Sequence, residues 1–416
     1  MKKMIIYGVI AVWLVSTASS CEKSEHKIQD GKELTLTPEE QQKVRQDNLF
    51  AFQLFKQATS DLQGGQNALL SPLSISTALA MTANGAKGTT RDAIARTLKF
   101  ADFDADMINE YYQKLITDLP LLDPKTDLSM ANSIWYRQGF EVLPDFLDVS
   151  HKFYKAEVAA LDFTDPKAPE NINNWVSRNT NDKIPTIVDQ IPDYMIMYLI
   201  NAVYFKGSWE QQFDPSATRQ GLFYRINSNP LETEFMQIEH TFDVAANEFV
   251  EAIELPYQNK RYSMIVLKPA DGKSPSEVLS ELNQENRWED LMSGFSSRKT
   301  KISLPKFKFS YENQLKDELT ALGMGEAFSD GADFTGINET GAITIGEVKH
   351  KSFIEVNEEG AEAAAVTSVG IVVTSLPQIY TFNVDRPFLF AIREMSTGLI
   401  LFIGQVNDPS VEQSQG

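Results

Sequence analysis

The chain has 416 residues, 42% of them hydrophobic, with 57 acidic against 38 basic side chains, a formal charge of -19 and a single cysteine. This composition supplies enough apolar mass for a sizeable core, which excludes a disordered chain, a collagen-like repeat and a disulfide-stabilised mini-protein. Phosphate binding depends on clustered Lys and Arg, and the sequence has no such cluster, so nucleic acid is excluded as a partner.

The N-terminus has the features of an export signal. Residues 1–20 join a positively charged start, an apolar run from Met4 to Val15 and a row of small residues, which is the pattern of a signal peptide. The apolar run is shorter than the roughly 20 residues of a spanning helix. Because Cys21 follows directly, the segment resembles a bacterial lipoprotein signal with Cys21 as the lipidated residue; an ordinary signal peptide with an unmodified thiol is the alternative. We expect a bacterial cell-envelope lipoprotein, periplasmic or on the cell surface, or otherwise a secreted protein.

The rest of the chain divides into a body and two polar ends. Residues 21–46 lack apolar periodicity and predict a flexible tether. No linker, repeat or long charge block interrupts residues 47–406, which predicts one folded domain. Residues 407–416 are polar again and predict a disordered tail.

Helical patterns come first in the body. Asn48–Phe55 carries apolar residues at helical spacing, and Ser71 followed by a proline predicts the start of a second helix. A third helix is expected over Gly88–Leu98, with Thr89 or Thr90 as its cap.

Strand patterns follow the helices. Alternating or apolar runs rich in β-branched and aromatic residues predict strands at Tyr262–Leu267, Lys301–Leu304 and Phe388–Ile392. Helices followed by strands, with few βαβ units, predict an α+β fold with antiparallel or mixed sheets.

The motifs of common enzymes are missing. The four histidines lie far apart in sequence and never at the HExxH spacing, and one cysteine cannot form a zinc site. Gly272-Lys273-Ser274 lacks the earlier glycine of a phosphate loop, and Ser296–Lys299 matches S-x-x-K without its partner motifs. We therefore expect no catalytic activity, no metal and no cofactor.

The most informative segment runs from Glu358 to Pro377. No charge occurs between Ala363 and Gln378, and the preference changes from Ala-rich and helical to β-branched and extended. A buried central strand is the simplest interpretation, although about 14 residues beyond Gly360 would make an unusually long one. If exposed, the segment would be a hazard for edge pairing. Both states can occur in turn.

These residues resemble the serpin family of protease inhibitors. The segment Glu358–Ala365 is similar to the family's hinge, and Phe382–Phe390 is similar to the signature after its reactive loop. Further matching blocks, in chain order, are Asn67–Ser76, Gly85–Thr90, Ala131–Trp135 and Asn201–Trp209. The resemblance covers nearly all of residues 48–406.

The resemblance implies a fold and a mechanism. The fold would be α+β, with three β-sheets, eight or nine helices and an exposed reactive-centre loop. A target protease would cut the loop and form an acyl-enzyme, and the freed loop would insert as a new central strand of the main sheet. The nucleophile and general base would belong to the protease.

The loop sequence agrees with that requirement. Insertion buries alternate side chains, so a charge or proline among them would block it. The alternate set contains neither: Ala361, Ala363, Ala365, Thr367, Val369, Ile371 and Val373. Glu362 belongs to the other set, which would face outward.

The resemblance also implies site residues at matching positions. The hinge would comprise Glu358, Glu359, Gly360, Ala361, Glu362, Ala363, Ala364 and Ala365. A polar cluster beneath the main sheet, the shutter, would comprise Ser71, Ser74, Asn201 and His350. The breach, where insertion begins, would contain Trp209 and Lys306, with Lys306 near Glu358 as an exposed ion pair.

The resemblance implies a reactive bond at Thr374-Ser375, counted as in family members from Gly360 and back from Phe382, with Val373-Thr374 as the alternative. Small or β-branched residues before this bond favour elastase-like or subtilisin-like serine proteases, with papain-like cysteine proteases as a further alternative. Heparin activation in some serpins needs a basic helix, and the corresponding stretch 101–106 is acidic here, so the resemblance implies no heparin cofactor. We expect a monomer that reaches a membrane through its lipid anchor only.

Two other functions remain open. A serpin-like binding or carrier protein would never trap a protease. An exported hydrolase is disfavoured, because the nucleophile and base motifs are missing.

Overall fold

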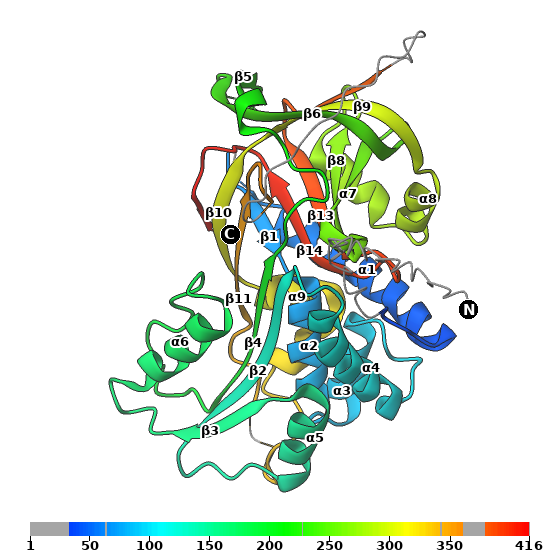
Figure 1. Cartoon of the computed structure of the whole chain (residues 1–416). Coiled ribbons are helices and arrows are strands. Elements are labelled where there is room, and N and C mark those ends of the chain that lie inside the picture. Colours follow the sequence, from blue (N-terminus) through cyan, green and yellow to red (C-terminus); the bar gives the residue numbers. More distant parts are fainter. Residues whose placement is uncertain (1–32, 63–64, 227, 342, 361–378, 416) are drawn as a thin grey trace, which may run out of the picture. The chain divides into compact units, whose positions relative to one another are not determined.

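The first helix begins earlier than the sequence pattern predicted. The computed structural model describes residues 33–62, 65–226, 228–341, 343–360 and 379–415 (Figure 1). α1 spans Pro38–Ala58, and Thr37 and Glu40 form a reciprocal capping box at its start. Because this cap begins the helix and Leu34 is buried, the predicted tether 21–46 is wrong over its described part; the signal segment and Cys21 lie outside the described residues.

Eight further α-helices occur in the described residues: α2 (Pro72–Ala83), α3 (Gly88–Thr97), α4 (Ala105–Asp118), α5 (Pro144–Tyr154), α6 (Ala168–Asn179), α7 (Pro275–Leu282), α8 (Arg287–Ser293) and α9 (Lys316–Leu319). Ser71 caps α2 as predicted, since its hydroxyl accepts a hydrogen bond from the Ser74 N–H. The predicted threonine cap of α3 is wrong: Lys87 precedes the helix, and the Thr90 hydroxyl accepts from the Asp333 N–H instead. No helix of the described residues is long and apolar enough to cross a membrane.

A nine-stranded sheet contains the three predicted strands. Its order is β1-β14-β13-β8-β7-β6-β9-β12, with β5 on β6. The strands are β1 (Ala68–Leu70), β5 (Arg219–Phe223), β6 (Leu231–Ala246), β7 (Val250–Pro256), β8 (Tyr262–Pro269), β9 (Ser296–Pro305), β12 (Tyr380–Asn383), β13 (Phe388–Glu394) and β14 (Ile400–Val406). β13 and β14 lie in the middle of the core, where all seven residues of β14 are buried.

Two three-stranded sheets complete the described fold. One has the order β3 (Glu157–Leu161), β2 (Asp127–Arg137), β4 (Met197–Lys206); the other has the order β11 (Lys349–Val356), β10 (Phe307–Gln314), β15 (Gln413–Gln415). β4 and β11 run side by side in Figure 1, yet no ladder joins them within the described residues. The prediction of an α+β fold with three sheets is confirmed.

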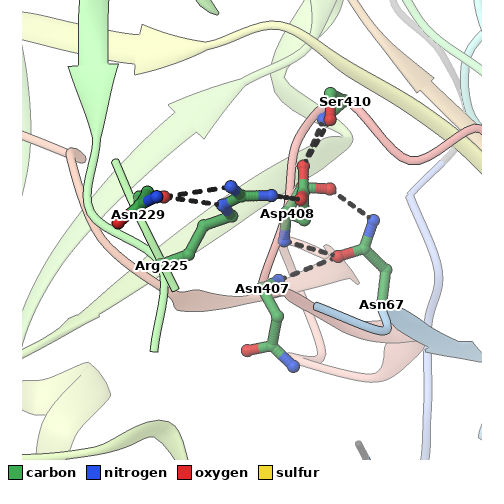
Figure 2. A network of polar contacts seen from close by, with 6 residues as sticks. All are labelled: Asn67, Arg225, Asn229, Asn407, Asp408 and Ser410. Carbon is green, nitrogen blue, oxygen red and sulfur yellow. Dashed lines mark hydrogen bonds and ion pairs between the residues drawn. The ribbon is translucent and has the colours of Figure 1, made fainter. Parts of the chain in front are cut away.

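The described C-terminal residues pack against the body and pair with one of its strands. Asn407 and Asp408 are buried, Asn67 binds the backbone of both (Figure 2), and β15 pairs with β10 in parallel. The predicted disordered tail 407–416 is therefore wrong for its described residues. The Asn407 and Asp408 side chains bind Gln405 and Arg225 of the body, which the polarity of the sequence does not reveal.

Candidate functional site

A cavity lies between the C-terminal ends of β4 and β11. It has a volume of about 250 Å³ and is lined on one side by Tyr204–Lys206 and on the other by Phe353–Val356, while Ile392 and Phe402 of the large sheet contribute apolar surface. An extended chain between the two strands would find backbone donors and acceptors on both sides, because each has an edge without a partner strand in the described structure.

The predicted shutter residues meet at the N-terminus of α2. The Ser71 N–H donates to Nε2 of His350 on β11 at 3.1 Å, and the Ser74 hydroxyl donates to the Asn201 side-chain oxygen on β4. One turn of α2 therefore contacts both strands that border the cavity. The resemblance implied these four residues from separate parts of the sequence, and the structure places them together.

His350 accepts this bond as a neutral imidazole. Its side chain is buried, and burial lowers the pKa of the imidazole from 6.5 to about 4. The Ser71 N–H points at Nε2, so protonation of that nitrogen would replace an acceptor with a donor. The contact between α2 and β11 consequently depends on the charge state of one buried side chain.

The predicted breach residue Trp209 holds the chain that follows β11. Its indole N–H donates to the Asn357 carbonyl at 2.9 Å, and its backbone N–H donates to the Glu359 carbonyl at 3.3 Å. The ring stacks on Tyr257 with centroids 4.6 Å apart. The start of the hinge is thus attached to the segment that follows β4.

The Glu358 carboxylate lies at the centre of a small polar network. It accepts a hydrogen bond from the Thr218 hydroxyl at 2.7 Å and pairs with Lys306 at 3.4 Å, while Lys306 also pairs with Glu234 at 3.1 Å. The predicted proximity of Lys306 and Glu358 is confirmed, but the expected exposed pair is wrong for Glu358, whose side chain is only 11% exposed. Burial raises the pKa of Glu358, and bonds from Thr218 and Lys306 reverse that effect and lower it overall.

Gly360 ends the described part of the hinge. Its φ is +77°, and a Cβ added there would lie 2.4 Å from the Trp209 nitrogen and 2.7 Å from the Gly207 carbonyl oxygen. Both the backbone conformation and the lack of space require glycine. Ala361 to Ala365 and both candidate bonds, Val373-Thr374 and Thr374-Ser375, lie outside the described residues.

Sequence reasoning missed several partners of these residues. Asn132 on β2 accepts from the Asn201 amide at 2.6 Å and donates to the Tyr154 carbonyl at 2.7 Å. Asn132 lies inside a block that already pointed to the family, so that block was a usable signal. Thr218, by contrast, has no local pattern that marks it. Within the described residues, no cluster of His, Cys, Asp or Glu could hold a metal ion.

Comparison with known families identifies this arrangement. A family model described as Serpin (serine protease inhibitor) matches residues 45–409. The chain belongs to the serpin family. Serpins are generally protease inhibitors and not catalysts, although some members do not inhibit, and their targets are proteases.

Individual serpins are similar over most of their length. The leukocyte elastase inhibitor of Xenopus tropicalis is 34% identical over 378 residues, covering 86% of this chain and 97% of that protein. The native-state crystal structure of tengpin, a thermophilic serpin, has 34% identity and a TM-score of 0.80, covering 91% of this chain and 96% of tengpin. Human thyroxine-binding globulin has 26% identity and a TM-score of 0.81, covering 89% and 100%.

Proposed function

We propose that this serpin inhibits an elastase-like or subtilisin-like serine protease by inserting its cleaved reactive loop between β4 and β11. The protease would attack the loop, form an acyl-enzyme with the residue before the cut, and remain attached when the loop becomes a strand. The serpin is consumed in a single reaction and contributes no nucleophile or general base.

The observation that carries the proposal is the unpaired boundary between β4 and β11. The chain that leads into the loop already starts at this boundary, since Trp209 binds the backbone of Asn357 and Glu359. Continuing from Gly360 between the two strands would extend the chain into the cavity that they border. The uncharged alternate set from Ala361 to Val373 has the composition that such a path requires.

The free energy available is large enough for this task. Burial of several aliphatic side chains at ~25 cal/mol per Å², with roughly a dozen ladder hydrogen bonds near ~1 kcal/mol each, gives on the order of 10 to 20 kcal/mol. A typical domain is stable by about 5 to 15 kcal/mol. Insertion could therefore deform an attached protease, and the uncut form would persist because of a kinetic barrier.

The residues before the reactive bond support the proposed protease class. With cleavage at Thr374-Ser375, the protease would meet Ile371–Thr374, which are small or β-branched. A shallow apolar specificity pocket accepts such residues, whereas a trypsin-like pocket needs Arg or Lys. The leukocyte elastase inhibitor among the relatives is consistent with this choice.

Incubation of the purified protein with pancreatic elastase or subtilisin tests the proposal. We expect a complex that survives denaturing electrophoresis, and mass spectrometry of the released C-terminal fragment should place the cut at Thr374-Ser375. Cleaved serpin without a covalent complex would contradict inhibition and favour a non-inhibitory serpin. Trapping of papain but neither serine protease would leave the mechanism intact and change the target class.

A matched pair of loop variants tests insertion itself. Thr367→Arg places a charge in the alternate set that would be buried, so the variant should become mainly a substrate, with a stoichiometry of inhibition raised by roughly tenfold or more. Ser368→Arg places the same charge in the set that would face outward and should inhibit like the parent. If both variants inhibit equally well, the loop does not insert in the register that buries Thr367.

The location of the inhibitor is part of the proposal. Lipidation of Cys21 would hold the serpin in the cell envelope, close to proteases arriving from outside. Metabolic labelling with a fatty acid should modify the parent but not Cys21→Ser. Labelling of neither protein would indicate an ordinary signal peptide.

A further inference from the structure

The C-terminal segment leaves β14 in a direction that one buried side chain fixes. Asn67, which precedes β1, accepts from the N–H groups of Asn407 at 2.8 Å and Asp408 at 3.0 Å, and its amide donates to the Asp408 carbonyl at 2.8 Å (Figure 2). Asn67 is fully buried. Through these three hydrogen bonds the Asn67 side chain takes the place of a neighbouring strand and fixes the backbone that follows β14.

A turn then redirects the chain. The Asp408 carbonyl accepts from the Val411 N–H at 3.4 Å, with Pro409 at the second position, where proline is favoured. The Asp408 carboxylate accepts from both the N–H and the hydroxyl of Ser410 and pairs with Arg225 at 2.7 Å. Burial raises the pKa of Asp408, and the bonds from Ser410 and Arg225 outweigh this and lower it overall.

The turn delivers the chain to the outer edge of β10. β11 occupies one edge of β10 along all eight residues, and β15 pairs in parallel with Ser310–Glu312 on the other, where the Ser310 N–H donates to the Glu412 carbonyl at 3.0 Å. Without β15, backbone groups in the middle of β10 would lack a strand partner. Such an edge is a template for a strand from another molecule.

The side chains along β10 favour pairing with another copy of the same strand. If two copies pair antiparallel about Ser310, Lys308 of each copy lies opposite Glu312 of the other. Both side chains are partly exposed, at 53% and 31%. Each also pairs with β11 of its own copy, Lys308 with Glu355 at 3.7 Å and Glu312 with Lys351 at 3.0 Å, so the contacts between copies would add to these pairs or exchange with them. Opposite charges at directly paired positions stabilise antiparallel strands, and a twofold arrangement makes the contact twice.

We propose that β15 shields the outer edge of β10 from pairing with the same edge of a second copy. The proposal is independent of protease inhibition, because β10 and β15 lie on the far side of β11 from the cavity. It assigns a role to a C-terminal extension that the polar composition had marked as a disordered tail.

Truncation after Ser410 removes β15 and leaves the contacts of Asn67 and Arg225 in place. We expect the truncated chain to change from monomer to dimer mass in sedimentation, and the Ser310 and Glu312 amides of its monomer to exchange hydrogen roughly tenfold faster or more. The measurement should be made with Thr367→Arg also present, so that association through the reactive loop cannot mimic the result. A truncated chain that stays monomeric at every concentration, whatever its exchange rates, would overturn the proposal.

Two point substitutions repeat the test in the full chain. The parallel register directs the Ser414 N–H toward β10 and the Gln413 N–H away from it. Ser414→Pro should therefore promote dimers, whereas Gln413→Pro should stay monomeric like the parent. Adding Lys308→Glu to the truncated chain should return it to monomer, because the introduced carboxylate would face Glu312 of the other copy; dimers that persist would contradict the edge-to-edge contact.

Discussion

At the scale of single residues, His350 couples the boundary between β4 and β11 to pH. The imidazole has a pKa of about 4 in the folded protein against 6.5 for an unperturbed histidine. The unfolded chain therefore binds the proton more readily, so the contribution of His350 to stability is complete above pH 6.5 and is lost as the pH falls toward 4.

The expected loss is about 3 kcal/mol at the lowest pH of this range. The midpoint of urea unfolding should fall between pH 7 and pH 5, and His350→Gln should flatten that dependence. His151→Gln is the control, because His151 is exposed on α5 and should leave the slope unchanged. An equal pH slope in parent and His350→Gln would show that other groups cause it.

Gly360 gives a second prediction at the same scale. Gly360→Ala combines a positive φ with a Cβ that would press on the Trp209 backbone, so the native form should lose more than the about 1–3 kcal/mol of backbone strain alone. Gly139→Ala is the matched control: its φ is +86° and no atom lies within 4 Å of the added Cβ. The thermal midpoint of Gly360→Ala should be lower than that of Gly139→Ala. The reverse order would contradict the close packing of Gly360 against the Trp209 backbone.

At the scale of secondary-structure elements, the edges of β4 and β11 should accept an added strand. A synthetic peptide with the sequence of residues 361–373 should raise the thermal midpoint of the native protein and abolish complex formation with elastase, because it would fill the path that the loop needs. The same peptide carrying Thr367→Arg should do neither. Stabilisation by both peptides would indicate binding elsewhere.

Elements also show what the sequence could and could not predict. The helix at Ser71 and the strands near residues 262, 301 and 388 were predictable, because their caps and alternation are local signals. The Thr37–Glu40 capping box was readable too, since S/T-x-x-E before an apolar run marks a helix start, but the polar residues around it concealed the signal. The position of Asp408 could not be predicted: its anchor, Asn67, is 341 residues away, and no local pattern records such a contact.

The residues of the candidate site likewise include some that the sequence predicted and some that it did not. Ser71, Ser74, Asn201 and His350 were found because the resemblance to the family implies them; the first three lie in matching blocks, and His350 precedes the hinge. The burial of Glu358 was not found, because its contacts with Thr218 and Lys306 are tertiary and leave no local pattern.

At the scale of the whole molecule, cutting the loop should stabilise the protein. If residues 361–373 become a strand after cleavage, the thermal midpoint should rise by at least about 20 °C, given 10 kcal/mol or more of added stability. Brief digestion near residue 374 followed by calorimetry measures this change. Thr367→Arg cut at the same bond should keep its original midpoint; a cleaved parent that melts like the uncut one would identify a non-inhibitory serpin.

The two hydrogen bonds from the N-terminus of α2 have a mechanical consequence for the proposed loop insertion. Ser71 is hydrogen-bonded to β11 and Ser74 to β4, so the N-terminus of α2 links the two strands across the boundary between them. β4 and β11 cannot move apart while both hydrogen bonds hold. The bond that breaks first determines which of the two strands moves away from α2. If the loop inserts as proposed, the two hydrogen bonds of Ser71 and Ser74 must break before the acyl bond is hydrolysed, so they bear on whether the protease is trapped or released.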